Sequence, residues 1–409
     1  MGTQFKGTAR CVVAVAAILI ALATATAPAG AEPGKTEMPS RFKIAGDSNL
    51  ATADGELWFE TTVYSWKARS WQAEVVRHRP GGGWDRLPLT KVFQASTTDF
   101  AVRASDDGGP SLPCVGGFGL TAGKPGGRVQ CFEDGHWNKL ALDPSFDGMR
   151  MAGLDASGPD FTALFTNWTN GSLPRHQRRP RIALGKIEDG KVTPLGPVLN
   201  VKGPPMFPTL GRRTDDAAPV TADVMIQGRY GKAVDDASLA TLEEGRWTMT
   251  DLPRRRGSAR GGPVRSADGV YTSVSGLRSE SATVLRTDDG QTTKLSGRNR
   301  GSAGRFLEGT ELFPVGDDVW LWSGAVDTDG ERHWAGYEYW TPIEPDGSGF
   351  ARPRQIPRDH RDLSSYPGMT EYQGHPVFLY SRAQAQYSLP VIDFSRVRAG
   401  NSASGSAGE

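Results

Sequence analysis

The stretch V-Q-C-F-E-D-G-H-W-N-K-L-A-L, residues 129–142, consists of two short strand-like segments joined by an acidic turn that ends in Gly135. An apolar strand, one or two acidic residues, a glycine and a second short strand are typical of a β-hairpin. The same pattern occurs five more times, at residues 75–89, 182–195, 237–252, 282–295 and 339–353. The turn glycines recur at a mean spacing of about 53 residues: Gly83, Gly135, Gly190, Gly245, Gly290 and Gly349.

A second alternating strand pattern, such as A-D-G-V-Y-T-S-V-S-G-L at residues 267–277, precedes each hairpin by about twenty residues. Each unit therefore carries four strands, A to D, and no helical pattern. A repeat of this length made of strands predicts a β-propeller. Residues 32–409 contain about seven such units, whereas six blades would need a period near 63 residues and eight a period near 47. We therefore expect an all-β, seven-bladed β-propeller.

The sequence predicts separate segments before and after this domain. Lys6 and Arg10, the apolar run from Val12 to Leu22 and the triplet Ala29-Gly30-Ala31 are typical of a secretory signal peptide, which we assign to residues 1–31. This apolar run is too short for a transmembrane anchor. We expect a flexible linker at 32–40, one propeller domain at 41–398 and a disordered Gly/Ser tail at 399–409. The last unit lacks its fourth strand, and we expect Arg41 to Ala45 to close the ring there.

Removal of the predicted signal peptide changes the number of cysteines in the mature chain. Once the signal peptide with Cys11 is removed, Cys114 and Cys131 remain. An even number of cysteines in an exported chain favours a disulfide, with two independent buried thiols as the alternative. Two cysteines are too few for a structural zinc site, and we expect no metal and no cofactor.

Over nearly all of the predicted mature chain, the units resemble those of β-propeller repeat proteins at the level of architecture. The segment Arg286-Thr-Asp288-Asp-Gly290-Gln-Thr292 is similar to a degenerate Asp-box, S-x-D-x-G-x-T-W, of sialidase-like propellers. It lacks the leading Ser and the final Trp of that motif. No sialidase residue can be carried over to this chain.

Charged residues are sorted by the type of loop in which they lie. In a propeller the A–B and C–D turns emerge on one face, and the B–C and D–A loops on the other. The A–B and C–D turns carry eighteen acidic residues: Asp54, Asp106, Asp107, Asp160, Asp215, Asp216, Asp268, Asp317, Asp318, Glu133, Asp134, Glu188, Asp189, Glu243, Glu244, Asp288, Asp289 and Asp346. We therefore expect one acidic face.

The opposite loops collect arginine and aromatic residues. Arginine recognises carboxylate, sulfate and phosphate groups in a bidentate manner, and aromatic rings stack on sugars. We predict a ligand-binding face made of Trp66, Arg69, Trp71, Trp168, Arg178, Arg179, Arg181, Tyr230, Arg254, Arg255, Arg256, Arg300 and Arg358. The alternative is an ordinary solvated surface, because charged residues are common in turns and long loops.

These patterns predict a binding module more than an enzyme. The net charge of +1 argues against a nucleic-acid protein, and the six histidines show no metal-binding spacing. We expect a secreted, monomeric, non-catalytic module whose partner is an anionic glycan or a cell-envelope polymer. Two alternatives remain. A polysaccharide hydrolase or lyase would show buried carboxylates with shifted pKa values near the channel mouth, and a protein-interaction scaffold would show an apolar patch.

Overall fold

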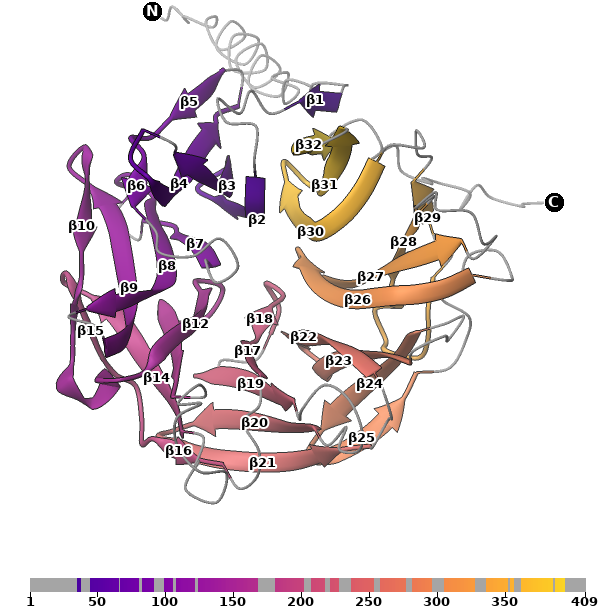
Figure 1. The fold of residues 1–409 in the computed structure, drawn as a ribbon. Coiled ribbons are helices and arrows are strands. Elements are labelled where there is room, and N and C mark those ends of the chain that lie inside the picture. The colour runs from indigo at the N-terminus through magenta and orange to yellow at the C-terminus, as the bar shows by residue number, and fades with distance from the viewer. Residues whose placement is uncertain are drawn as a thin grey trace, which may run out of the picture.

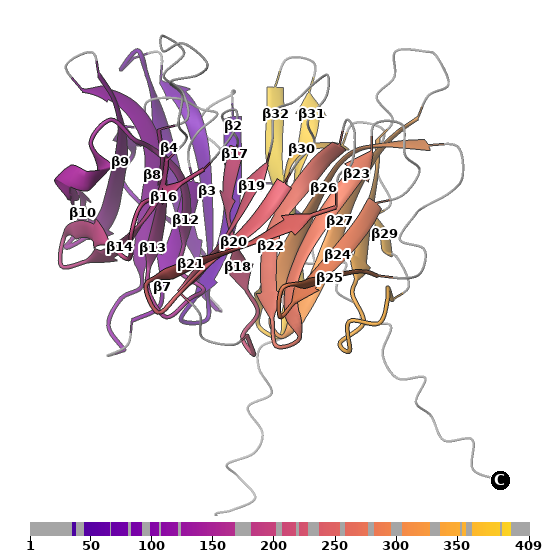
Figure 2. The same cartoon turned by 90° about the horizontal axis from the view of Figure 1, so that it is seen from below.

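The computed structural model describes residues 35–37, 45–65, 67–80, 83–91, 99–105, 108–121, 124–167, 181–201, 207–217, 221–227, 237–253, 258–276, 282–295, 305–327, 336–351, 354–356, 362–384 and 387–393. The described strands form seven sheets arranged around a central axis (Figure 1). Seen from the rim, the sheets make a disc whose strands run across its thickness (Figure 2). The predicted all-β propeller is confirmed.

In every sheet the first three main strands are antiparallel neighbours that follow one another outward from the axis. The innermost strands contact one another around the ring: β2 (Ala45–Ala53), β7 (Asp99–Arg103), β12 (Arg150–Asp155), β17 (Phe207–Leu210), β22 (Ser258–Ser266), β26 (Arg305–Val315) and β30 (Asp362–Tyr372). The second strands are β3 (Glu56–Ser65), β8 (Leu112–Thr121), β13 (Thr162–Thr166), β19 (Ala222–Gln227), β23 (Gly269–Gly276), β27 (Asp318–Asp327) and β31 (His375–Gln384).

The remaining strands lie further from the axis, except for β18. The third strands are β4 (Ser70–His78), β9 (Lys124–Glu133), β14 (Arg181–Glu188), β20 (Ala237–Glu243), β24 (Ala282–Asp288), β28 (Gly336–Pro342) and β32 (Tyr387–Asp393). The outer strands are β5 (Trp84–Arg86), β10 (His136–Lys139), β15 (Lys191–Pro194), β21 (Arg246–Leu252), β25 (Gln291–Lys294), β29 (Arg354–Ile356) and β1 (Lys35–Glu37). Short accessory pieces are β6 (Thr90–Lys91), β11 (Ala141–Leu142), β16 (Leu199–Asn200), β18 (Arg212–Arg213) and the 3₁₀ turn η1 (Pro144–Phe146).

Six sheets are formed by strands that lie close together in the sequence, whereas the seventh joins both chain ends. In that sheet β1 pairs antiparallel with β32, with Lys35 opposite Asp393. The prediction of a seven-bladed ring is therefore not confirmed, because six blades are built from consecutive strands and the mixed sheet is not one of these six. The position predicted for the added strand, Arg41 to Ala45, is wrong, because Ala45 opens the inner strand β2 and 41–44 lie outside the described residues. A three-residue strand such as β1 is too short to show an alternating pattern, and it falls within the stretch assigned to a linker.

The repeated hairpin turns have a common backbone conformation. At the turn between β9 and β10, Asp134 has φ 53° and Gly135 has φ 82°. Positive φ at both central residues is the mark of a type I′ turn, which matches the twist of the two strands and favours glycine. The same acidic residue and glycine pair recurs at Gly190, Gly245 and Gly290. The last hairpin differs from the prediction, since the positive φ falls on Gly347 and not on Gly349.

Apolar side chains between adjacent sheets form the core. One cluster joins the sheets of β8 and β13 through Met151, Phe146 and Phe165, and the last two rings stack with centroids 4.4 Å apart. Two tryptophans on outer strands tie neighbouring sheets together. Trp137 Nε1 donates to the Pro88 carbonyl at 2.6 Å, and Trp247 Nε1 donates to the carbonyl of Pro197 at 2.7 Å. The hairpin repeat therefore also sets contacts between blades.

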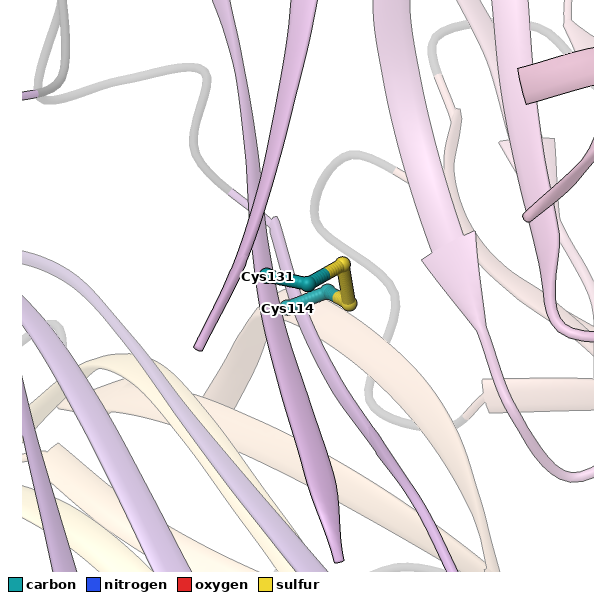
Figure 3. The surroundings of a disulfide bond; sticks show 2 residues. All are labelled: Cys114 and Cys131. Carbon is teal, nitrogen blue, oxygen red and sulfur yellow. A yellow bond between two sulfur atoms is a disulfide. The ribbon is translucent and has the colours of Figure 1, made fainter. Parts of the chain in front are cut away.

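The predicted disulfide is present. Cys114 on β8 lies directly opposite Cys131 on β9, with the Cα atoms 4.1 Å apart (Figure 3). Both residues are buried within the same apolar cluster. The bond therefore links the second and third strands of one sheet.

Candidate functional site in the central channel

A cavity of about 520 Å³ opens at the centre of the disc, where the inner strands end and their A–B turns begin. Its volume falls within the range of small-molecule sites. Residues from six sheets line it, and the polar ones include Thr52, Asp155, Ser157, Arg212, Asp215 and Glu371. The cavity is therefore a property of the assembled ring and not of any single repeat.

A local change of strand partner places Arg212 in this cavity. After β17 the backbone turns at Gly211, whose N–H donates to the Asp223 carbonyl at 2.7 Å. The chain then runs as β18 parallel to β22 of the next sheet, with Arg212 opposite Val264. The Arg212 guanidinium lies 5.7 Å from the centroid of the Phe313 ring, within the range of a cation–π contact. Arg212 thus projects from one sheet toward its neighbours.

Three carboxylates from different sheets surround Arg212. Asp99 on β7 accepts hydrogen bonds from the N–H groups of Leu154 at 2.8 Å and Phe100 at 2.9 Å. Asp155, at the end of β12, accepts from the N–H and hydroxyl of Ser157. Glu311 on β26 accepts from the Gly262 N–H on β22 at 3.1 Å. Asp99 and Glu311 each bridge two neighbouring sheets.

Burial raises the pKa of all three carboxyl groups. For Asp99 and Glu311 the positive charge of Arg212 and the backbone donors act against this rise but do not cancel it. For Asp155 the hydrogen bonds from Ser157 are the main opposing influence. A carboxyl group with a raised pKa holds its proton closer to neutral pH, which is a property that acid–base catalysis requires.

A bidentate ion pair lies on the outer side of this group. Arg265 on β22 donates from Nε at 2.6 Å and from Nη2 at 2.7 Å to the two oxygens of Asp223 on β19. The Thr241 hydroxyl also donates to Asp223 Oδ1 at 2.7 Å, and Asp223 is buried. The neighbouring Arg213 is also buried and interacts electrostatically with Asp155 and Asp223. These contacts fix the orientation of the β18 segment.

The mouth of the cavity is acidic. Glu371, near the end of β30, lies above Gly316 of the neighbouring sheet so closely that a side chain at position 316 would overlap its carboxylate. The Asp215 N–H donates to the Gly316 carbonyl at 3.1 Å and brings a third sheet to the same place. Burial, followed by the negative charges of Asp215, Asp317 and Asp318, raises the pKa of Glu371.

The sequence analysis assigned the A–B and C–D turns to one face, and contacts among the described residues agree. Arg286, just before a C–D turn, pairs with Asp268 of an A–B turn at 3.1 Å and also donates to the carbonyl of Asp346 in the next sheet. Lys186 pairs in the same way with Asp160 at 3.3 Å. The acidic turns and the mouth of the cavity therefore share one face.

The predicted arginine and aromatic face can be examined at only three positions. Arg69 is exposed in the turn between β3 and β4, Trp71 is half-buried on β4, and Arg181 is half-buried at the start of β14. All three lie at B–C connections, on the face opposite the cavity mouth. The other predicted members lie outside the described residues: Trp66, Trp168, Arg178, Arg179, Tyr230, Arg254, Arg255, Arg256, Arg300 and Arg358. The binding face stays a prediction.

The sequence analysis did not single out Arg212, Asp99, Asp155, Glu311 or Glu371. Asp99 left a signal, because it is a charged residue next to the apolar segment F-A-V at 100–102. The adjacent arginines Arg212 and Arg213, which Thr214 separates from the Asp215-Asp216 turn, were a further signal. The spacing of repeats could not show that these residues converge on one axis.

Other site types find no support in the described part of the chain. No group of three or more histidine, cysteine or acidic side chains there could hold a metal ion. Within the same residues, no helix has the length and apolar character needed to cross a membrane. The large apolar side chains that are exposed there are Leu89, in the connection between β5 and β6, and Met249, on β21 of another sheet.

Solved structures of similar fold include parts of hydrolytic enzymes. The chain is similar to the β-propeller domain of the trilobed protease from Pyrococcus furiosus, described as having an open velcro topology, with TM-score 0.50, 11% identity, and coverage of 87% of this chain and 96% of that one. It is also similar to the acylaminoacyl peptidase of Pyrococcus horikoshii, with TM-score 0.49 and 10% identity over 85% of this chain and 51% of that one. An α-L-arabinofuranosidase from Fusarium graminearum gives TM-score 0.48 and 11% identity over 90% and 100%.

No family model and no curated protein matches the chain. The chain spans about half the length of the peptidase. At 11% identity, the likeness to the Pyrococcus furiosus domain shows the propeller fold and nothing further about activity.

Proposed function

We propose that this protein is an exported carbohydrate-binding module whose ligand enters the central cavity at the A–B face. The observation that carries the proposal is the lining of the cavity, in which carboxylates, arginines and hydroxyl groups from four sheets converge on one space. Sugar hydroxyl groups both donate and accept hydrogen bonds, so a lining of mixed donors and acceptors suits them. The signal-like N-terminus and the disulfide support action outside the cytoplasm.

The test uses a cavity-filling variant. Ala104 is exposed and lines the cavity, so Ala104→Trp should obstruct it without removing any polar contact. Ala141→Trp, at an exposed position on the short strand β11, serves as the matched control. We expect equilibrium binding of oligosaccharides by calorimetry, weakened at least about tenfold by Ala104→Trp and unchanged by the control. Binding that survives Ala104→Trp would place the ligand elsewhere.

A second candidate function is hydrolysis of the bound polysaccharide. Of the buried carboxyl groups with raised pKa values, Asp155 lines the cavity, whereas Asp99 and Glu311 are not part of its lining, so the condition stated above for an enzyme is met in part. One carboxyl group that keeps its proton could donate it to a glycosidic oxygen while an ionised one assists water attack. Reducing ends should then appear in the binding mixtures. Asp155→Asn should stop their release while the sugar still binds; absence of release by the wild type would leave a binding module.

Binding of an anionic polymer remains a separate proposal for the opposite face, supported by the sequence cluster Arg254 to Arg256. Acidic residues at the cavity mouth would repel such a polymer there. Binding of an acidic polysaccharide that weakens with salt and is lost on replacing Arg254, Arg255 and Arg256 by alanine would support this second surface. Unchanged binding in that variant would rule it out.

A further inference from the structure

The deep part of the cavity and its mouth differ in charge balance. At depth, Arg212 and Arg213 line the cavity together with Asp155, and the charge of Arg212 also acts on Asp99 and Glu311, which are not part of the lining. Each of these three carboxylates also accepts an N–H hydrogen bond. In the deep part of the cavity, the arginines and carboxylates therefore attract one another. At the mouth, Glu371 and Asp215 line the cavity, with Asp317 and Asp318 beside them, and Arg212 and Arg213 are the only basic side chains in the described lining.

The carboxylates at the mouth lie at the ends of neighbouring inner strands or in the turns that follow them, and contacts with the Gly316 turn bring them close together. Glu371 lies over the Gly316 turn, Asp215 is tied to that turn through its N–H, and Asp317 directly follows Gly316. Repulsion among these carboxylates contributes to the raised pKa values of Glu371 and Asp318. After burial, the charges of Asp215, Asp317 and Asp318 raise the pKa of Glu371, and those of Asp317 and Asp216 raise the pKa of Asp318.

Like charges gathered at the entrance of a cavity concentrate ligands of the opposite charge. A cation placed among these carboxylates would relieve their repulsion, whereas an anion would add to it. His375 is the titratable group of opposite sign that interacts with Glu371, and it is exposed to solvent. The negative charges at the mouth therefore favour a positively charged ligand group, while the deeper lining supplies hydrogen-bond donors and acceptors.

We propose that the ligand of the central cavity is an amino sugar chain that presents an ammonium group to Glu371 and Asp215. This inference rests on the proposed carbohydrate-binding function and names the substrate class of the same site. Amino groups donate hydrogen bonds that carboxylates accept, and charge-assisted bonds of this kind are stronger than neutral ones. The hydroxyl groups of the same sugar would then meet the mixed donors and acceptors deeper in the cavity.

The test compares two oligosaccharides that share one backbone. A β-1,4-linked glucosamine oligomer with free amines and its fully N-acetylated counterpart of equal length are titrated into the protein at neutral pH in low and moderate salt. We expect the amine-bearing oligomer to bind about tenfold more tightly, and the ratio to shrink as salt rises. Glu371→Gln should reduce this ratio by about fivefold, because it weakens binding of the amine-bearing oligomer more than binding of the acetylated one.

Glu243→Gln is the matched control, because Glu243 is an exposed residue of β20 next to a C–D turn and does not line the cavity. It should leave both affinities as they are. Equal binding of the two oligomers would overturn the charge selection while the proposed carbohydrate function stands. Failure of both to bind, in protein that melts cooperatively, would overturn the proposed function itself.

Discussion

Reduction of the Cys114–Cys131 disulfide gives a direct measure of how this blade is stabilised. The two cysteines are 17 residues apart in sequence and lie opposite each other on β8 and β9. Restricting an unfolded loop of this length stabilises the native state by about 3 kcal/mol. For a chain of this size, in which the entropy of unfolding scales with length, that corresponds to a loss of about 4 °C in melting temperature.

The assay is calorimetry of the oxidised and the reduced protein, with free thiols counted in denaturant to show that reduction is complete. A double variant, Cys114→Ala with Cys131→Ala, should melt at or below the temperature of the reduced protein, because both positions are buried and lose packing as well. Reductant should not change the melting of that variant. An unchanged melting temperature with both thiols free would refute the reasoning.

Three further predictions concern contacts between sheets. Asp223→Asn should cost about 3–5 kcal/mol in denaturant unfolding, because it leaves Arg265 without its bidentate carboxylate; a loss below about 1 kcal/mol would contradict a structural role. The folded-state pKa of Glu311 is raised, so its contribution to stability is greatest below the ordinary value of 4.5 and is lost as pH rises. The melting temperature of Glu311→Gln, compared with that of the wild type at the same pH, should therefore increase from acid to neutral pH. A difference between the two melting temperatures that stays constant with pH would contradict this. Trp137→Phe should cost about 1 kcal/mol through the lost bond to the carbonyl of Pro88, and a variant as stable as the wild type would show that this bond is replaced by water.

Local signals in the sequence were sufficient for the repeat and its turns. The acidic residue and glycine pair at Asp134-Gly135 takes the type I′ conformation that its residue types favour, and this conformation recurs at three more of the predicted hairpins. The pairing of Cys114 with Cys131 also followed, because the residues after the predicted signal peptide offer one combination. Such features depend on residues that are neighbours in sequence or in one hairpin.

Contacts between distant segments could not be predicted in this way. The strand β1 adds to β32 across nearly the whole chain, and three residues carry no periodic signal. The position of Arg212 depends on β18 leaving its own sheet to pair with β22, which no repeat pattern encodes. The candidate site therefore lay on the face for which the sequence analysis predicted only an acidic surface.

Hydrogen exchange with and without a saturating amino sugar oligomer would test the central claim most directly, namely that the ligand enters the cavity at the A–B face. The account predicts slower exchange in peptides that cover residues 52–55, 155–157, 212–215 and 370–373, which line or adjoin the cavity. Peptides from the opposite loops, such as those containing Arg69 or Arg181, should be unaffected. Protection confined to those opposite loops, with no change around Arg212 and Glu371, would contradict the account.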